Sequence, residues 1–206
     1  MKNTGKNSFV RGMSLVMTFL ALTGLVLLFS VPVITAGPAI TAGYYVALKA
    51  VEGSEYKIWQ GFWHSFRQNL KQGIVLGLIV FVPCGLLLFA LQNMYENGGY
   101  SVPYILVLLV YVLIAASAVY VFPLLSRFDN TVIDTLRIAV STAFHFLTST
   151  IIMTTGLLLA LMLAQNTVWW ILLPLLPLWL YATSYIDAPI FAALIAEKNK
   201  HEEGGH

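Results

Sequence analysis

The stretch VPVITAGPAITAGYY, residues 31–45, follows a long apolar run and precedes the first cluster of charged side chains. It decides the fold, because the chain can either continue away from the preceding run or turn back beside it. Pro38 suits the first position of a new helix, where its missing N–H is not needed, and Gly37 relaxes the backbone before it. The stretch therefore permits a turn followed by a short helix over residues 40–49.

Composition places this turn in a membrane protein. The 206 residues are 59% hydrophobic and 10% charged, whereas about a quarter of the residues in a soluble domain are charged. A helix needs about 20 apolar residues to cross a membrane, and nothing in the chain alternates as barrel strands do. We therefore predict an all-α, polytopic helical membrane bundle. Asp, Glu, Lys and Arg are absent from residues 13–34, 73–93, 98–126 and 138–186.

The number of crossings depends on the opening stretch. Cytoplasmic loops of membrane proteins carry an excess of Lys and Arg. If the run at 13–34 crosses and the chain then turns and returns through residues 40–49, all eleven Lys and Arg side chains lie in the cytoplasm. This arrangement gives six transmembrane helices with both termini cytoplasmic; five is the alternative, because the second helix is short. The other four predicted crossings are residues 74–93, 103–125, 146–164 and 168–186.

The predicted organisation is a single transmembrane domain between two polar tails. The domain covers residues 13–190, the basic cytoplasmic tail before it residues 1–12, and the polar cytoplasmic tail after it residues 191–206. Within the domain, two units run in the same direction, each with an amphipathic segment between an incoming and an outgoing span. We interpret these units as a parallel internal repeat, of the kind that occurs in transporter folds.

Two segments predict amphipathic connecting helices on the cytoplasmic face. In residues 56–73 the apolar side chains recur at helical spacing on one face, and cations lie largely on the other, as in helices at a membrane interface. In residues 130–146 the apolar side chains recur every fourth residue, with Asn130 or Thr131 as the expected N-cap. Both helices could simply connect spans, with their apolar faces packed on the bundle. As contacts for a partner or for lipid, the sequence offers Trp59, Trp63, Arg67, Arg127, Asp129 and Asn130.

Three landmarks carry a family resemblance. In order along the chain they are PVITAGPAITAGYYVALK, FWHSFRQNLKQG and YVFPLLSRFDNTVIDTLRIA. Their order and spacing resemble those of the YesL-like family of bacterial integral membrane proteins, a domain of unknown function, over about residues 9 to 190. The resemblance implies a multi-pass protein of the bacterial plasma membrane, often encoded beside genes of carbohydrate uptake and degradation. It assigns no catalytic residue.

Known catalytic and ligand-binding motifs are missing from the sequence. It has no nucleotide-binding loop, metalloprotease motif or nucleophile elbow, so we expect neither an enzyme nor a cofactor or metal site. No basic stripe suggests nucleic acid. We interpret Asp187, at the end of the last predicted span, as a helix break or an interfacial carboxylate.

Two functions remain open. The first is an accessory protein that assembles with or regulates a carbohydrate uptake system. The second is a small transporter in its own right, including as a dimer. Coupled transport usually leaves ionisable residues deep in the membrane, and the sequence shows none within the predicted spans. We therefore expect the accessory role.

Overall fold

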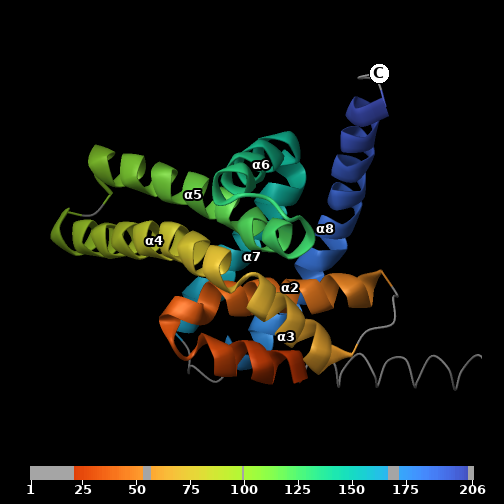
Figure 1. Cartoon of the computed structure of the whole chain (residues 1–206). Helices are drawn as coiled ribbons and strands as arrows, with labels where there is room; N and C mark the ends of the chain where they lie inside the picture. The colour runs from red at the N-terminus through yellow and green to blue at the C-terminus, as the bar shows by residue number, and fades with distance from the viewer. Residues whose placement is uncertain (1–20, 53–56, 99, 167–171, 204–206) are drawn as a thin grey trace, which may run out of the picture.

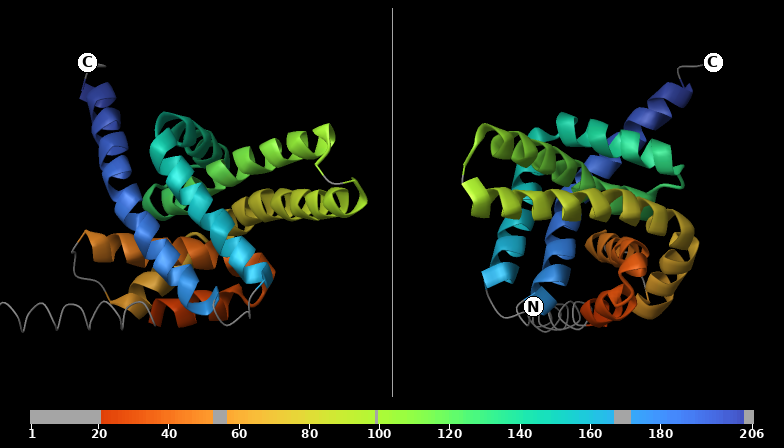
Figure 2. Two further views of the ribbon diagram at one scale, coloured as in Figure 1. Left: turned by 180° about the vertical axis from the view of Figure 1, so that it is seen from behind. Right: turned by 90° about the vertical axis from the view of Figure 1, so that its left-hand side faces the viewer.

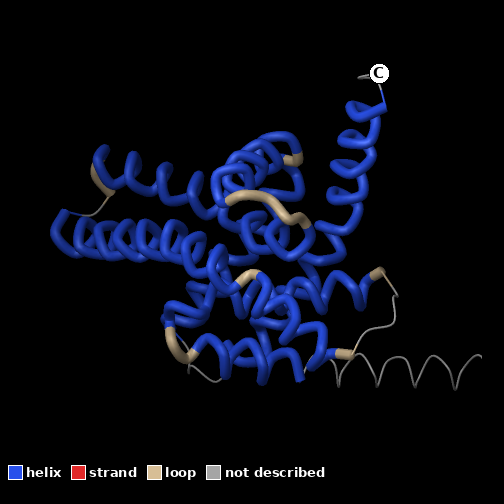
Figure 3. Tube along the Cα trace, in the orientation of Figure 1, coloured by secondary structure: helices blue, strands red, loops and turns tan. Residues whose placement is uncertain are grey.

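The chain is built of helices joined by short connections. The computed structural model describes residues 21–52, 57–98, 100–166 and 172–203, and over these residues Figure 3 shows helices and loops but no strand. The predicted all-α class is confirmed. An apolar helix, Ala21–Ser30, comes first. It is followed by η1 (Val33–Thr35), α2 (Ala36–Val51), α3 (Ile58–Gln68), α4 (Leu70–Gly98), α5 (Val102–Arg127), α6 (Val132–His145), α7 (Leu147–Asn166) and α8 (Leu172–Glu203).

The chain turns back within the opening stretch, as predicted. The first helix ends at Ser30, and α2 runs back beside it (Figure 1). Thr35 closes the turn, because its hydroxyl lies within hydrogen-bond distance of the carbonyl oxygens of Phe29, at 2.6 Å, and Pro32, at 2.9 Å. Pro38 lies in the first turn of α2, where a missing N–H leaves no helix hydrogen bond unmade.

Helix α2 is the centre of the bundle. Ten of its sixteen residues are buried, and it packs against α3, α4, α5 and α8. The first turn of α2 crosses α4 at a point where both helices carry glycine residues. A Cβ added to Gly37 would lie 2.1 Å from the carbonyl oxygen of Gly73, and one added to Gly73 would lie 2.9 Å from Pro38. Gly73 and Gly77 have the small-xxx-small spacing that lets membrane helices approach closely.

Helices α4 and α5 form an antiparallel hairpin that projects from the rest of the molecule (Figures 1 and 2). Only 22% of the most apolar 18-residue segment of α4 is buried, and only 33% of the corresponding segment of α5. A continuous apolar surface of this kind marks a membrane or partner interface. Lipid is the simplest environment that suits both helices. The large apolar side chains exposed along the hairpin include Leu78, Val82, Leu86, Phe89, Ile105, Leu106 and Leu109.

The two amphipathic connectors are present as α3 and α6. Each is followed after one residue by the next long helix, at Asn69 for α3 and at Phe146 for α6. The bend between α6 and α7 is 104°, so α6 lies almost perpendicular to the helix that follows it. The order helix, amphipathic helix, long helix thus occurs twice, in α2–α3–α4 and in α5–α6–α7, as the repeat hypothesis requires.

The structure shows which faces of the connectors are buried. In α3 the buried side chains are Phe62, Ser65 and Phe66, whereas Trp59, on the same predicted apolar face, is 58% exposed. In α6 the apolar side chains that recur every fourth residue form a stripe, of which Val132 and Leu136 pack against the core whereas Val140 and Phe144 are exposed. Small side chains allow the closer approach to the bundle, so they take the inner face of α6. They are Thr135, Ala139, Thr142 and Ala143.

Helix α8 is longer than the predicted last span. It begins at Leu172 and continues to Glu203, through Pro189. The prediction that Asp187 and Pro189 break the helix is therefore wrong. A proline removes one helix hydrogen bond and costs about 3 kcal/mol, and burial of Ile190 and Phe191 in the core offsets part of this cost.

Among the described residues, three helices are long and apolar enough to cross a membrane: Leu70–Asn97, Val102–Arg127 and Trp179–Ala196. A fourth is added if the bent pair α6–α7 counts as one span. The predicted six crossings are not confirmed. One reason is that α2, at a rise of about 1.5 Å per residue, extends only about 24 Å. Another is that the basic tail and the first part of the first predicted span, residues 13–20, lie outside the described residues, and the described part of that span is the short helix Ala21–Ser30.

Candidate functional site

Asp187 lies in the middle of α8 and is fully buried. Its exposed fraction is 0%, and neither carboxyl oxygen has a hydrogen-bond partner among the described residues. The interpretation of Asp187 as an interfacial carboxylate is therefore wrong, because the helices around α8 cover it. Asp187 also falls within the candidate span Trp179–Ala196. An ionisable side chain inside a membrane span indicates a functional site.

Tyr44 of α2 reaches the same face of α8. Thr183 precedes Asp187 by four residues, so the two side chains share one helix face, and the hydroxyl oxygens of Tyr44 and Thr183 are 3.0 Å apart. The Thr183 hydroxyl is also within hydrogen-bond distance of the carbonyl oxygens of Trp179, at 2.9 Å, and Leu180, at 3.2 Å. Because Thr183 has a single hydroxyl proton, it donates to a carbonyl and Tyr44 donates to Thr183.

Tyr120 of α5 makes an equivalent contact with α7. Its hydroxyl is 3.1 Å from that of Thr150, and Thr150 lies 2.9 Å from the carbonyl oxygens of both Ala143 and Phe146. Thr150 therefore donates to a carbonyl and accepts from Tyr120. The hydroxyl protons of both tyrosines are therefore engaged in hydrogen bonds to threonines. We call Tyr44, Tyr120, Thr150, Thr183 and Asp187 the buried polar layer.

A cavity of about 380 Å³ adjoins the polar layer. It lies between α2, α4, α5, α7 and α8, and Tyr44 forms part of its wall. Tyr111, Cys84 and the indole N–H of Trp179 add polar groups to a lining that is otherwise apolar. Its volume falls in the range of about 300–1,000 Å³ that small-molecule sites occupy. The arrangement can hold a mainly apolar molecule with one or two polar groups.

A second, smaller cavity of about 240 Å³ lies beside α6 and α7. Thr150 and Thr154 line it, and the Thr154 hydroxyl has no hydrogen-bond partner within the described part of the chain. Metal ligands do not gather at either cavity: no group of three His, Cys, Asp or Glu side chains occurs among the described residues.

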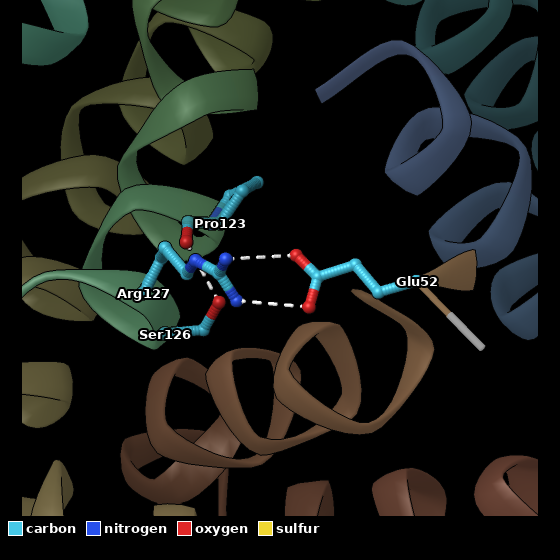
Figure 4. A network of polar contacts seen from close by, with 4 residues as sticks. All are labelled: Glu52, Pro123, Ser126 and Arg127. Carbon is cyan, nitrogen blue, oxygen red and sulfur yellow. Dashed lines mark hydrogen bonds and ion pairs between the residues drawn. The ribbon is translucent and has the colours of Figure 1, made fainter. Parts of the chain in front are cut away.

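Arg127, a predicted contact residue, forms an ion pair with Glu52 (Figure 4). The two guanidinium nitrogens lie 2.9 Å and 3.1 Å from the two carboxylate oxygens, a bidentate geometry that fixes orientation. The pair joins the end of α2 to the end of α5. Both side chains are 34% exposed, and pairs in contact with solvent contribute only up to about 1 kcal/mol.

Asp129 and Asn130 follow Arg127 in the same loop. Asp129 accepts a hydrogen bond of 3.1 Å from the side-chain amide of Gln68, at the end of α3. Asn130 is half-buried, and the N-cap of α6 is Thr131, whose hydroxyl accepts from the backbone N–H of Asp134. The loop is thereby tied to both α2 and α3, and the repeated units meet here.

Trp59, Trp63 and Arg67 form a separate surface along α3. The indole rings of Trp59 and Trp63 are stacked, with centroids 6.2 Å apart and an interplanar angle of 4°. The Arg67 guanidinium lies 5.3 Å from the Trp63 ring. A shallow groove with Gln60, His64 and Gln68 runs along the same helix face. The structure therefore divides the six predicted contact residues between this surface and the loop of Arg127, Asp129 and Asn130.

Comparison with known protein families gives a match in the first part of the chain. Residues 15–91 match DUF624, a family described as protein of unknown function. The predicted resemblance is confirmed over this segment. No curated protein and no solved structure matches the chain.

The DUF624 segment contributes only part of the polar layer. It contains Tyr44, the glycine crossing and α3, whereas Tyr120, Thr150, Thr183 and Asp187 lie beyond it. Sequence reasoning missed the polar layer because Asp187 stands past the end of the charge-free run. The signal was present in the sequence TSYID: Thr183, Ser184 and Asp187 recur at helical spacing.

Proposed function

We propose that this chain is an accessory protein of the bacterial plasma membrane, which assembles with or regulates a carbohydrate uptake system. We further propose six crossings with both termini in the cytoplasm. The link to carbohydrate uptake comes from the family resemblance. The role is non-enzymatic and uses surfaces of the folded bundle.

The distribution of charge supports this orientation. Arg67 and Arg127 lie with α3 and the end of α5, and Arg137 lies on α6. These elements are at the opposite end of the α4–α5 hairpin from its turn, where the charged side chain is Glu96. Cations on one side favour that side as cytoplasmic.

The exposed aromatic and cationic surface of α3 is the observation that carries the accessory role. Trp59 is mostly exposed although it is a large apolar side chain, and stacking on Trp63 holds it in place. Tryptophan and arginine are enriched where proteins bind each other. A cytoplasmic partner docked at the membrane surface would cover this face, with Arg67 beside the aromatic pair.

Copurification tests the accessory role. The full-length protein is extracted from membranes in mild detergent, and the proteins that accompany it are identified by mass spectrometry. We expect subunits of a carbohydrate uptake system. The double substitution Trp59→Ala and Arg67→Glu should remove them at least tenfold, whereas Glu96→Gln, at the other end of the hairpin, should not. Recovery of the chain alone, from cells that express such a system, would contradict the proposal.

A transporter in its own right is the second candidate, and one observation favours it. Asp187 supplies the ionisable group deep in a span that the sequence reasoning did not find, and a cavity adjoins its polar layer. Gradient-driven accumulation of a sugar by the purified protein in proteoliposomes would favour this candidate over the accessory role.

A further inference from the structure

The carboxyl group of Asp187 cannot remain a bare anion in this structure. It is fully covered, and both oxygens lack a hydrogen-bond partner among the described residues. Transfer of an unpaired carboxylate from water to an apolar interior costs far more than folding can supply, so such groups become neutral or acquire a positive partner.

Within the part of the chain that the structure describes, no charged or titratable group on the neighbouring helices forms a hydrogen bond with the Asp187 carboxyl group. Helices α2 and α7 pack against α8, and Tyr120 of α5 donates to Thr150 of α7. On α2, Tyr44 donates to Thr183, and the Lys49 ammonium lies 4.4 Å from the Tyr45 ring. At the ends of α2 and α5, Glu52 and Arg127 bind each other. On α7 the described groups are hydroxyls, and Thr150 already donates to a carbonyl.

We propose that Asp187 is a proton-binding site in α8, where this helix packs against α2 and α7. A bound proton makes the carboxyl group neutral, which the surrounding apolar side chains and engaged hydroxyls permit. Loss of that proton leaves a charge that needs water or a cation beside it, so deprotonation must be accompanied by separation of α8 from its neighbours. Protonation of Asp187 is thereby coupled to the packing of α8 against Tyr44, a residue that also lines the cavity. The inference does not depend on the accessory role, because it concerns only the interior of the bundle.

Infrared spectroscopy tests the proposal directly, because protonated and ionised carboxyl groups absorb at different frequencies. The chain contains three aspartates, and Asp129 and Asp134 are exposed. Full-length protein carrying ¹³C-labelled aspartate side chains is measured in detergent at pH 7. We expect a carbonyl band of a protonated labelled aspartate. This band should persist in the double variant Asp129→Asn and Asp134→Asn and disappear in Asp187→Asn.

The infrared spectrum of the unmutated protein is itself a test of the proposal, so the test does not require that Asp187→Asn folds. A spectrum containing only ionised aspartate would overturn the proposal. Thermal stability in sodium chloride and in choline chloride provides a second readout. Stabilisation specific to sodium that is lost in Asp187→Asn would also overturn it, because the site would then hold a metal cation in place of a proton.

Discussion

Replacing Gly37 by alanine is expected to prevent the bundle from forming. The added methyl group would lie 2.1 Å from the carbonyl oxygen of Gly73 and 3.2 Å from the Cα atom of Gly77. These are backbone atoms, so α2 and α4 would have to separate. Overpacking commonly costs 1–3 kcal/mol and occasionally more. We expect a loss of about 3 kcal/mol or more, seen as a strong reduction of folded protein extracted from membranes and a lower melting temperature in detergent.

Gly85→Ala provides the matched control for this substitution. Gly85 lies in α4, the helix that Gly37 touches, and nothing lies within 4 Å of the position of its added Cβ. Alanine favours a helix over glycine by about 1 kcal/mol. The variant should therefore be as stable as the original protein or more so. Equal melting temperatures for Gly37→Ala and Gly85→Ala would contradict the close crossing of α2 and α4.

Phe62→Ala should cause the second-largest loss of stability. The Phe62 ring is 0% exposed, and its centroid lies 5.7 Å from that of Phe29 and 6.1 Å from that of Phe66. The contact with Phe29 fastens α3 to the first helix, and Phe66 lies beside Phe62 on α3 itself. Truncating a buried phenylalanine to alanine costs about 3–5 kcal/mol, and we expect a loss within this range in denaturant unfolding of the detergent-solubilised protein.

Trp59→Ala, three residues earlier on the same helix, is the control for Phe62→Ala. It also removes an aromatic side chain, but one that is exposed. Trp59 is mostly exposed, and its ring partner among the described residues is Trp63 on the same helix. Its loss should cost about 1 kcal/mol or less, in line with an aromatic pair beyond area burial. If Trp59→Ala were as destabilising as Phe62→Ala, the inner face of α3 would be assigned incorrectly.

The order of the helices could be predicted from the sequence because local chemistry determines it. The charge-free runs predicted long helices, and the stretch around Pro38 predicted a turn. Thr131 before Asp134 predicted the start of a helix. Each of these depends on residues close together in the chain. The hairpin of α4 and α5 followed in the same way, since both runs exceed the length that one crossing needs.

The buried face of each helix and the depth at which each residue lies could not be predicted in this way, because they depend on contacts with residues far apart in the sequence. The stripe of Val140 and Phe144 is apolar, but a helix in a lipid environment gains as much by turning such a stripe outward. Small side chains such as Ala139 then allow closer packing inside. The contact of Gly37 with Gly73 and Gly77 could not be predicted either, because it depends on how α2 packs against α4.

The burial of Asp187 has a similar cause. The sequence shows a carboxylate two residues before a proline, which is a usual sign of a helix end. In the structure, α8 continues because Ile190 and Phe191 are buried beyond Pro189, and the ring of Phe191 contacts that of Phe128 at 5.8 Å. This contact between Phe191 and Phe128, which are far apart in the sequence, thus keeps the preceding turn of α8, with Asp187, inside the bundle.

Cysteine accessibility tests the central claim most directly, namely that the α4–α5 turn and the amphipathic helices lie on opposite sides of a membrane. In a Cys84→Ala background, Asn97→Cys at the end of α4 and Ser141→Cys on the exposed side of α6 are placed singly in the chain. In intact cells, an impermeant thiol reagent should label Asn97→Cys. It should label Ser141→Cys only after the membrane is opened. Labelling of both positions from the outside, or of Ser141→Cys alone, would contradict the account.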